Sequence, residues 1–316
     1  MDADSVRQGS VPLPPIDERK AAGVAKILQE SSKAIAEENV DKALTLLRSY
    51  LEVQDHPDVW LKLARVYRLI GDEIVARSMM RNVILRLNRP HIMDIITAKI
   101  PYTKLLLLEN LKLIYINIPK CGSSSLKDAI LVASSKQRQL EASHFHVQEF
   151  EKVVAFQELD STYKDYAKVA ITRHPLDRLR SYYRKNIREA QSLVRDAQGK
   201  SVYYGLSSNP SFSEVLRNFH EYRKVFDDFR HHTDPMTGYL GLVRSRYSNL
   251  FDVSDTNGAI GLLRTLTGED IPDIHNMRSE SSTLSISKED ADLENQLLNT
   301  FYRKELEVYF STDSKN

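Results

Sequence analysis

The chain contains two short apolar runs, each of which ends in a cluster of polar residues and then passes into helical periodicity. The first run, residues 113–118, has the β-branched and aromatic composition of a buried strand, and apolar residues recur at helical spacing across 124–133. The second run, residues 169–172, leads into a helix that begins at Pro175. A further strand is predicted at 250–253, and further helices at 212–229, 258–266 and 288–310. This alternation predicts an α/β fold with a P-loop-like parallel sheet flanked by helices, and with ligands at the carboxyl ends of the strands.

The N-terminal part of the chain follows a different pattern, with helical periodicity throughout residues 18–92. Two segments align at an offset of 33 residues, so that Ala43 corresponds to Ala76. This period resembles the tetratricopeptide repeat and predicts a small all-α, TPR-like region. Because two degenerate repeats are fewer than the three usually needed for stability, we expect a packing role, with binding of a protein partner as the alternative. The predicted organisation is a disordered tail at 1–17, the TPR-like region at 18–92 and one α/β domain at 93–316.

Composition and charge limit the class of protein. With 316 residues and 41% hydrophobic content, the chain can bury a substantial core. Its single cysteine excludes an internal disulfide, which suits a reducing cytosol. The sequence shows no apolar signal region and no run long enough for a membrane span, and its net charge is only +1. We therefore expect a cytoplasmic protein without a nucleic-acid partner.

The polar cluster after the first apolar run has the composition of an anion site. Lys120 adds a positive charge, and Gly122 lets the backbone approach a ligand closely. Ser123, Ser124 and Ser125 offer hydroxyl donors at the start of a helix, where free backbone N–H groups and the helix dipole favour an anion. The segment is not the P-loop of nucleotide triphosphatases, because its lysine precedes the only glycine. An ordinary strand-to-helix turn with a solvated lysine is the alternative.

A second polar cluster follows the second apolar run. Arg173 stands at the carboxyl end of the predicted strand, and Ser181 lies about two turns into the helix. Residues 171–190 carry six lysines or arginines against two acidic residues. A fork of guanidinium donors beside a hydroxyl suits a second phosphate. A solvated basic helix face is the alternative interpretation.

Together the two segments resemble the co-substrate signatures of sulfotransferases that use 3′-phosphoadenosine 5′-phosphosulfate (PAPS). The strings I-P-K-C-G-S-S-S-L and I-T-R-H-P-L-D-R-L-R-S-Y-Y-R-K-N are most similar to the carbohydrate and uronyl 2-O-sulfotransferase branch, and the resemblance covers about residues 105–310. It implies the sulfotransferase fold, PAPS as co-substrate without a metal, and an acceptor hydroxyl on a carbohydrate or glycoconjugate. It also implies that the loop from Lys120 to Ser125 holds the 5′-phosphosulfate, and that Arg173 and Ser181 hold the 3′-phosphate. Cys121 within that loop is given no chemical role.

Sulfuryl transfer needs a group that stabilises the leaving phosphate and a base for the acceptor hydroxyl. Lys120 suits the first role, because charge on the bridging oxygen grows as the S–O bond breaks. His144 and His146 would face the same side of an extended segment. The uronyl 2-O-sulfotransferases resemble this sequence here, which implies a base from this pair, with His146 slightly preferred. Two surface histidines are the alternative, and a metal site is not expected because no ligand cluster of zinc spacing accompanies them.

Several other segments have open roles. The loops around His231, His232 and His275 fall where relatives place acceptor and cap loops, and ordinary loop polarity is equally consistent with them. Residues 192–213, rich in glycine and serine, are expected to form a loop that could close over substrate.

Two classes of function remain open from the sequence. The first is a PAPS-dependent sulfotransferase acting on a hydroxyl. The second is a non-catalytic helical-repeat interaction protein with a degenerate P-loop-like domain. A phosphoryl kinase is less favoured, because no Asp-bearing metal motif accompanies Lys120.

Overall fold

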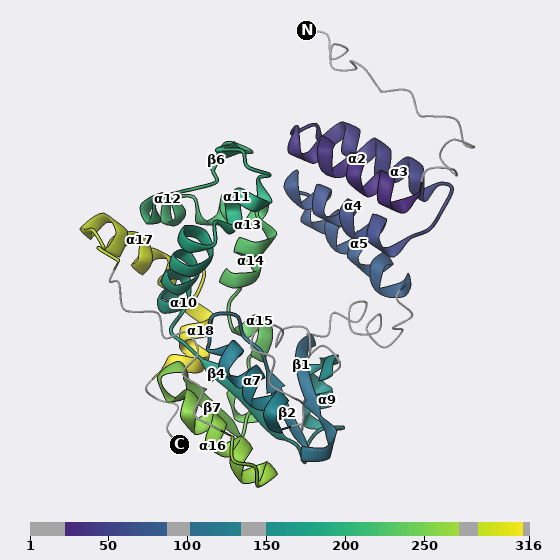
Figure 1. Cartoon of the computed structure of the whole chain (residues 1–316). Helices are drawn as coiled ribbons and strands as arrows, with labels where there is room; N and C mark the ends of the chain where they lie inside the picture. The colour runs from purple at the N-terminus through teal and green to yellow at the C-terminus, as the bar shows by residue number, and fades with distance from the viewer. Residues whose placement is uncertain (1–22, 87–101, 134–149, 272–283, 312–316) are drawn as a thin grey trace, which may run out of the picture. The chain divides into compact units, whose positions relative to one another are not determined.

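The computed structural model describes residues 23–86, 102–133, 150–271 and 284–311, and these form two compact units (Figure 1). The helical unit is drawn from Met1–Thr97, Val194–Ser208 and His220–Phe226, and the sheet unit from Ala98–Leu193, Asn209–Phe219 and Asp227–Asn316. Each unit is described by itself below.

The helical unit begins with two pairs of helices. They are α2 (Val24–Ala36), α3 (Val40–Leu51), α4 (Pro57–Leu69) and α5 (Glu73–Arg86), and each contacts the next along the chain. The two pairs start 33 residues apart, at Val24 and Pro57, which is the offset seen in the sequence. Ala43 and Ala64 are buried, so small side chains let the helices approach closely. Membership of the tetratricopeptide class stays a prediction.

A segment from the middle of the chain completes the helical unit. It contains the end of α11 (Ser192–Asp196) and the hairpin β5–β6 (Val202–Tyr203 and Leu206–Ser207). The hydroxyl of Tyr203 donates to the carbonyl of Ile35 in α2 at 3.5 Å. This part of residues 192–213 therefore has a hairpin and a contact with α2, and its closure over substrate stays a prediction.

The sheet unit is built on five strands in the order β3-β1-β2-β4-β7. Their bounds are Tyr102–Leu108 for β1, Leu113–Ile116 for β2, Glu151–Ala155 for β3, Ala167–Thr172 for β4 and Asn249–Asp252 for β7. Strands β2, β4 and β7 are parallel, whereas β1 runs antiparallel to both β2 and β3. The prediction of a parallel sheet is thus correct for β2, β4 and β7 and wrong for β1, which runs opposite to both of its neighbours. The short turn η1 (Glu109–Leu111) joins β1 to β2, and so short a connection allows only antiparallel pairing.

Helices cover the parallel centre of this sheet and bury its strands. All four residues of β2 are buried, as expected for a strand with both faces covered. Helix α7 (Ser123–Ala133) follows β2 and packs against α16 (Thr256–Thr267). After β4 comes α10 (Pro175–Tyr182), which continues into the π-helical segment η3 (Tyr183–Glu189). Two helix starts, at the carboxyl ends of neighbouring parallel strands, are therefore set side by side.

Two helices predicted as continuous are broken in the structure. The predicted helix 212–229 consists of α12 (Phe212–Arg217), α13 (Phe219–Val225) and the first turn of α14 (Asp227–Thr233). Asn218 is the C-cap of α12, and both its main-chain N–H (3.0 Å) and its side-chain amide (3.1 Å) donate to the carbonyl of Glu214. The predicted helix 288–310 is likewise divided into α17 (Lys288–Asn299), α18 (Arg303–Glu305) and η6 (Leu306–Phe310). The helical spacing of apolar residues continues across both breaks, so the sequence pattern did not indicate where the helices end.

Candidate functional site

The loop between β2 and α7 has a backbone shaped for close approach by a ligand. Lys120 has φ +63° and Gly122 has φ +70°, both in the left-handed region. Glycine adopts this conformation freely, but for lysine it costs about 1–3 kcal/mol, and such strain clusters at functional sites. A Cβ on Gly122 would also lie 3.4 Å from Oγ1 of Thr256. We call residues 117–125 the phosphate loop.

The phosphate loop forms one wall of a cleft of about 650 Å³ within the sheet unit. The lining residues are Asn117, Pro119, Lys120, Gly122, Ser123, Ser124, Ser125, Lys127, Arg173, Ser181, Lys185, Asn186, His231, His232 and Val253. The two polar clusters of the sequence are thus brought to one cleft, although Lys120 and Arg173 are 53 residues apart. Within the predicted loop, Cys121 does not line the cleft, because its side chain is fully buried. Burial also raises the pKa of its thiol to about 12.

Positive charge dominates the cleft. Lys120, Lys127, Arg173 and Lys185 line it, and the described lining residues include no carboxylate. Burial, Arg173 and Lys185 lower the pKa of the Lys120 ammonium. An anion that enters the cleft would therefore relieve repulsion between cations as well as gain hydrogen bonds.

Arg173 ties the second polar cluster to the phosphate loop. Its Nη1 donates to the main-chain carbonyl of Lys120 at 3.2 Å. Its Nε is buried and has no hydrogen-bond partner among the residues that the structure describes, and the same holds for Oδ1 of Asn117. A buried guanidinium N–H without an acceptor fits a site whose acceptor is a bound oxyanion.

Two other arginines of the second cluster have structural partners instead. Arg178 is buried and its Nη1 lies 3.3 Å from Oε1 of Glu305, a residue that is itself fully buried. Arg180 makes a two-pronged contact with Glu294, at 2.8 and 2.6 Å. The sequence could not separate these arginines from Arg173, because their partners lie more than 100 residues away along the chain.

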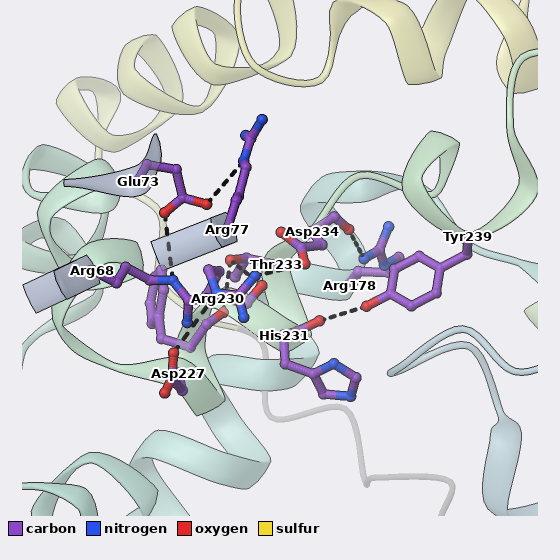
Figure 2. Close-up of polar contacts among 11 residues, drawn as sticks. Arg68, Glu73, Arg77, Arg178, Asp227, Arg230, His231, Thr233, Asp234 and Tyr239 are labelled. Carbon is purple, nitrogen blue, oxygen red and sulfur yellow. Dashed lines mark hydrogen bonds and ion pairs between the residues drawn. The ribbon is translucent and has the colours of Figure 1, made fainter. Parts of the chain in front are cut away.

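The histidine pair chosen as the source of the base, His144 and His146, lies outside the described residues, and so does His275. Two other histidines, His231 and His232 at the end of α14, do line the cleft. The main chain here is fixed by hydrogen bonds from the Tyr239 hydroxyl to the carbonyl of His231 (2.8 Å) and from Arg178 to the carbonyl of Asp234 (2.6 Å), as Figure 2 shows. A loop whose role the sequence left open is therefore part of the candidate site.

Sequence reasoning missed two functional candidates, Asn186 and Asp228. Asn186 accepts a hydrogen bond from Nζ of Lys120 at 2.9 Å. It lies in η3, and π-helical turns occur frequently at functional sites. Asp228 lies 3.3 Å from Nε2 of His232. Asn186 was the last residue of the second recognised segment, whereas nothing in the sequence marked Asp228.

The charge state of Asp228 is well defined. Burial alone would raise its pKa, but hydrogen bonds with His232, Tyr182 and Ser192, and the charge of His232, outweigh burial and lower the pKa to about 2. Tyr182 contributes directly, because its hydroxyl donates to Oδ2 of Asp228 at 2.8 Å. Asp228 is therefore a carboxylate at any pH near neutrality.

The described part of the chain holds no group of three or more histidine, cysteine or acidic residues able to bind a metal ion. None of its helices combines the length and the apolar character needed to cross a membrane.

These features define a class of protein: an α/β protein in which two strand-to-helix junctions direct cationic and hydroxyl groups into one anion-binding cleft. A family model described as the sulfotransferase family matches residues 104–315, which is more than half of the chain. The chain belongs to the sulfotransferase family, and its reaction class is sulfuryl transfer. Comparisons with curated proteins and with solved structures each found no match.

Proposed function

We propose that this protein transfers the sulfuryl group of PAPS to a hydroxyl of a carbohydrate or glycoconjugate. The observation that carries this proposal is the single cleft that joins the phosphate loop to Arg173 and Ser181. PAPS has two separate anionic ends, and the cleft presents two separate sets of donors at the carboxyl ends of β2 and β4. Its volume of about 650 Å³ is within the range of small-molecule sites.

The phosphate loop is the proposed site of the 5′-phosphosulfate. Ser123 begins α7, so the free N–H groups of that helix and the hydroxyls of Ser123, Ser124 and Ser125 can donate to phosphate oxygens. Lys120 would lie at the bridging oxygen, where negative charge grows as sulfur leaves the phosphate. Its contribution is therefore larger in the transition state than in the ground state.

Arg173 and Ser181 are the proposed ligands of the 3′-phosphate. Nε of Arg173, which has no partner in the described part of the chain, supports this role, because a phosphate oxygen would satisfy it. Ser181 is buried in α10 and lines the same cleft. Such a site would distinguish PAPS from nucleotides that lack a 3′-phosphate.

The base is proposed to be His146, with His144 as the second candidate. The base must take the acceptor proton as the oxygen attacks sulfur, and histidine suits this step near neutral pH. The carbohydrate acceptor is supported by the second recognised segment, which resembles the R-x-P-L-x-R-L-x-S-Y-Y pattern of the carbohydrate branch.

Transfer of labelled sulfate from PAPS by the purified full-length chain tests this proposal. The acceptor panel should contain sugars, glycolipids, phenols and tyrosine peptides, and we expect labelled product with a carbohydrate-bearing acceptor. Binding offers a second test, because a ligand at a hundredfold its dissociation constant adds about 2.7 kcal/mol to stability. We expect 3′-phosphoadenosine 5′-phosphate to raise the melting temperature, and ATP with magnesium to raise it much less. Equal stabilisation by both, with no sulfate transfer, would contradict the proposal.

A further inference from the structure

Asn186 and His232 lie between Lys120 and the half-buried carboxylate of Asp228. Nζ of Lys120 donates to Oδ1 of Asn186 at 2.9 Å. Nε2 of His232 lies 3.4 Å from Nδ2 of Asn186 and 3.3 Å from Oδ1 of Asp228. We propose that Asn186, His232 and Asp228 are positioning residues that aim the Lys120 ammonium and keep it charged. The proposal rests on the proposed function, in which Lys120 meets the leaving phosphate.

The orientation of the Asn186 amide follows from its neighbours. An ammonium group has only donors, so the amide oxygen must face Lys120 and the NH₂ group must face the other side, toward His232. One amide thus separates the lysine from the histidine and fixes the end of a long, flexible side chain. Because Asn186 also lines the cleft, its NH₂ group retains donor capacity for an oxyanion bound there.

The two ring nitrogens of His232 have different surroundings. Nε2 lies beside the carboxylate of Asp228, which can only accept a hydrogen bond. Nδ1 is buried and has no partner among the described residues, so a proton there would be an unsatisfied donor. A proton on Nε2 satisfies the Asp228 carboxylate, and Asn186 then contacts the ring at 3.4 Å without donating a hydrogen bond to it. In that state Nε2 has no lone pair for an acceptor proton, so His232 holds its neighbours in place and is not the base.

The carboxylate end of this network is rigidly held. The ring of Tyr182 stacks on His232 with a centroid separation of 4.8 Å, and its hydroxyl donates to Oδ2 of Asp228 at 2.8 Å. Tyr182 belongs to α10, whereas Asp228 and His232 belong to α14. Contact between these two helices therefore sets the position of the group that supports Lys120.

Asp228 also acts on Lys120 through its charge. Burial, Arg173 and Lys185 favour the neutral amine, whereas the carboxylates of Asp228 and Glu189 favour the ammonium. Asp228 has the larger effect of these two carboxylates. Removal of its charge must therefore lower the pH at which Lys120 loses its proton.

Replacement of the Asp228 carboxylate tests its effect on the charge of Lys120, and replacement of the neighbouring Asp227 is the matched control. Asp228→Asn should move the titration of Lys120 to lower pH, because the favourable carboxylate charge is removed. Asp227→Asn makes the same charge change on the same helix, at a residue 3.8 Å from Nε of Arg230, and should leave the titration unchanged. The titration can be followed by NMR in protein labelled with [ε-¹³C]lysine, with the Lys120 signal assigned through Lys120→Arg. The alkaline limb of the kcat profile should shift in the same direction as the signal.

Two further variants separate positioning from base catalysis. Asn186→Ala should lower kcat roughly tenfold to a hundredfold, as expected for the loss of one hydrogen bond to a charged group. The Michaelis constant for PAPS should stay within about twofold. His232→Gln retains an amide donor for Asp228, and we expect a loss of kcat no larger than that of Asn186→Ala, with the acid limb of the pH profile retained. A loss of a hundredfold or more with disappearance of the acid limb would make His232 the base and overturn the proposal.

The NMR arm needs no substrate, so failure of this inference is distinguishable from failure of the proposed function. If the wild-type chain transfers no sulfate from PAPS, but Asp228→Asn shifts the Lys120 signal and Asp227→Asn does not, the proposed function fails and the positioning role stands. If both variants leave the Lys120 titration at its wild-type position, the positioning role is wrong even in an active sulfotransferase.

Discussion

The two junctions that form the cleft have similar positions in the sheet but use their polar residues differently. The phosphate loop after β2 directs Lys120, Gly122 and its three serines into the cleft. The segment after β4 is richer in positive charge, yet Arg178 and Arg180 are engaged by carboxylates of the C-terminal helices. A count of basic residues therefore overstates the number of ligand contacts, because buried carboxylates also need cations. Measurements on single residues can test this division between ligand contacts and structural contacts.

Arg178 should give the largest effect, and the effect should be on stability. Arg178→Met leaves the buried carboxylate of Glu305 without its cation, which typically costs about 3–5 kcal/mol. Urea denaturation of Arg178→Met should show this loss of stability. The double variant, Arg178→Met with Glu305→Leu, should lose less, because no carboxylate is left without its cation. If Arg178→Met has wild-type stability but reduced affinity for 3′-phosphoadenosine 5′-phosphate, Arg178 belongs with the ligand contacts.

Lys120 should give the largest effect on catalysis. Lys120→Ala should reduce kcat by roughly 10²–10³, the range for loss of one transition-state donor, with little change in PAPS affinity. Single-turnover kinetics and equilibrium binding of PAPS measure the two quantities separately. A variant with unchanged turnover and a raised Michaelis constant would show that the phosphate loop only anchors the co-substrate.

His146 lies between the two junctions in the sequence. Its replacement should lower turnover, as the replacement of Lys120 should. His146→Ala should lower kcat about a hundredfold with PAPS affinity intact, and His144→Ala should lower it less. The acid limb of the pH–rate profile should disappear in the essential variant. Near-wild-type rates in both variants and in the double variant would exclude this pair as the source of the base.

Arg173 should affect binding selectively. Arg173→Ala should weaken binding of 3′-phosphoadenosine 5′-phosphate by about 1.5–3 kcal/mol, the range for a charged hydrogen bond. Adenosine 5′-phosphosulfate, which lacks the 3′-phosphate, should bind nearly as before. Isothermal titration calorimetry with both ligands makes the comparison, and equal losses for the two would remove Arg173 from the 3′ site.

Asp228 should have the smallest effect, which is on the stability of the fold and depends on pH. Its pKa of about 2 in the folded protein is below the value of 3.8 for a free aspartate, so its charge stabilises the fold above about pH 4 and loses that effect as the pH falls toward 2. After allowance for partial exposure, this contribution is about 1 kcal/mol. Urea denaturation at pH 5 and pH 3 should show the stability gap between wild type and Asp228→Asn narrowing at the lower pH. Asp227→Asn is again the control, and an equal narrowing there would contradict the assignment.

Local patterns in the sequence predicted the elements that carry the cleft. The strands that became β2, β4 and β7, and the starts of α7 and α10, depend on periodicity and on nearby residues such as Pro175 in the first turn of α10. Strand β1, which runs antiparallel to its neighbours, and strand β3 were not predicted, because long-range packing decides which strands pair. The contact of Arg178 with Glu305 spans 127 residues, and that of Asn186 with His232 joins two separate helices. Composition shows which polar groups exist, and only the fold shows which of them meet.

Because Cys121 is buried, chemical labelling of its thiol can measure how often the phosphate loop opens locally. At pH 8, a thiol with a pKa of about 12 is almost entirely protonated and, being fully covered, cannot react until the structure around it opens. Cys121 is the only cysteine in the chain, so each labelling event reports opening of the sheet unit at this one position. The rate of alkylation therefore gives the free energy of local opening under native conditions, without a mutation or an attached probe.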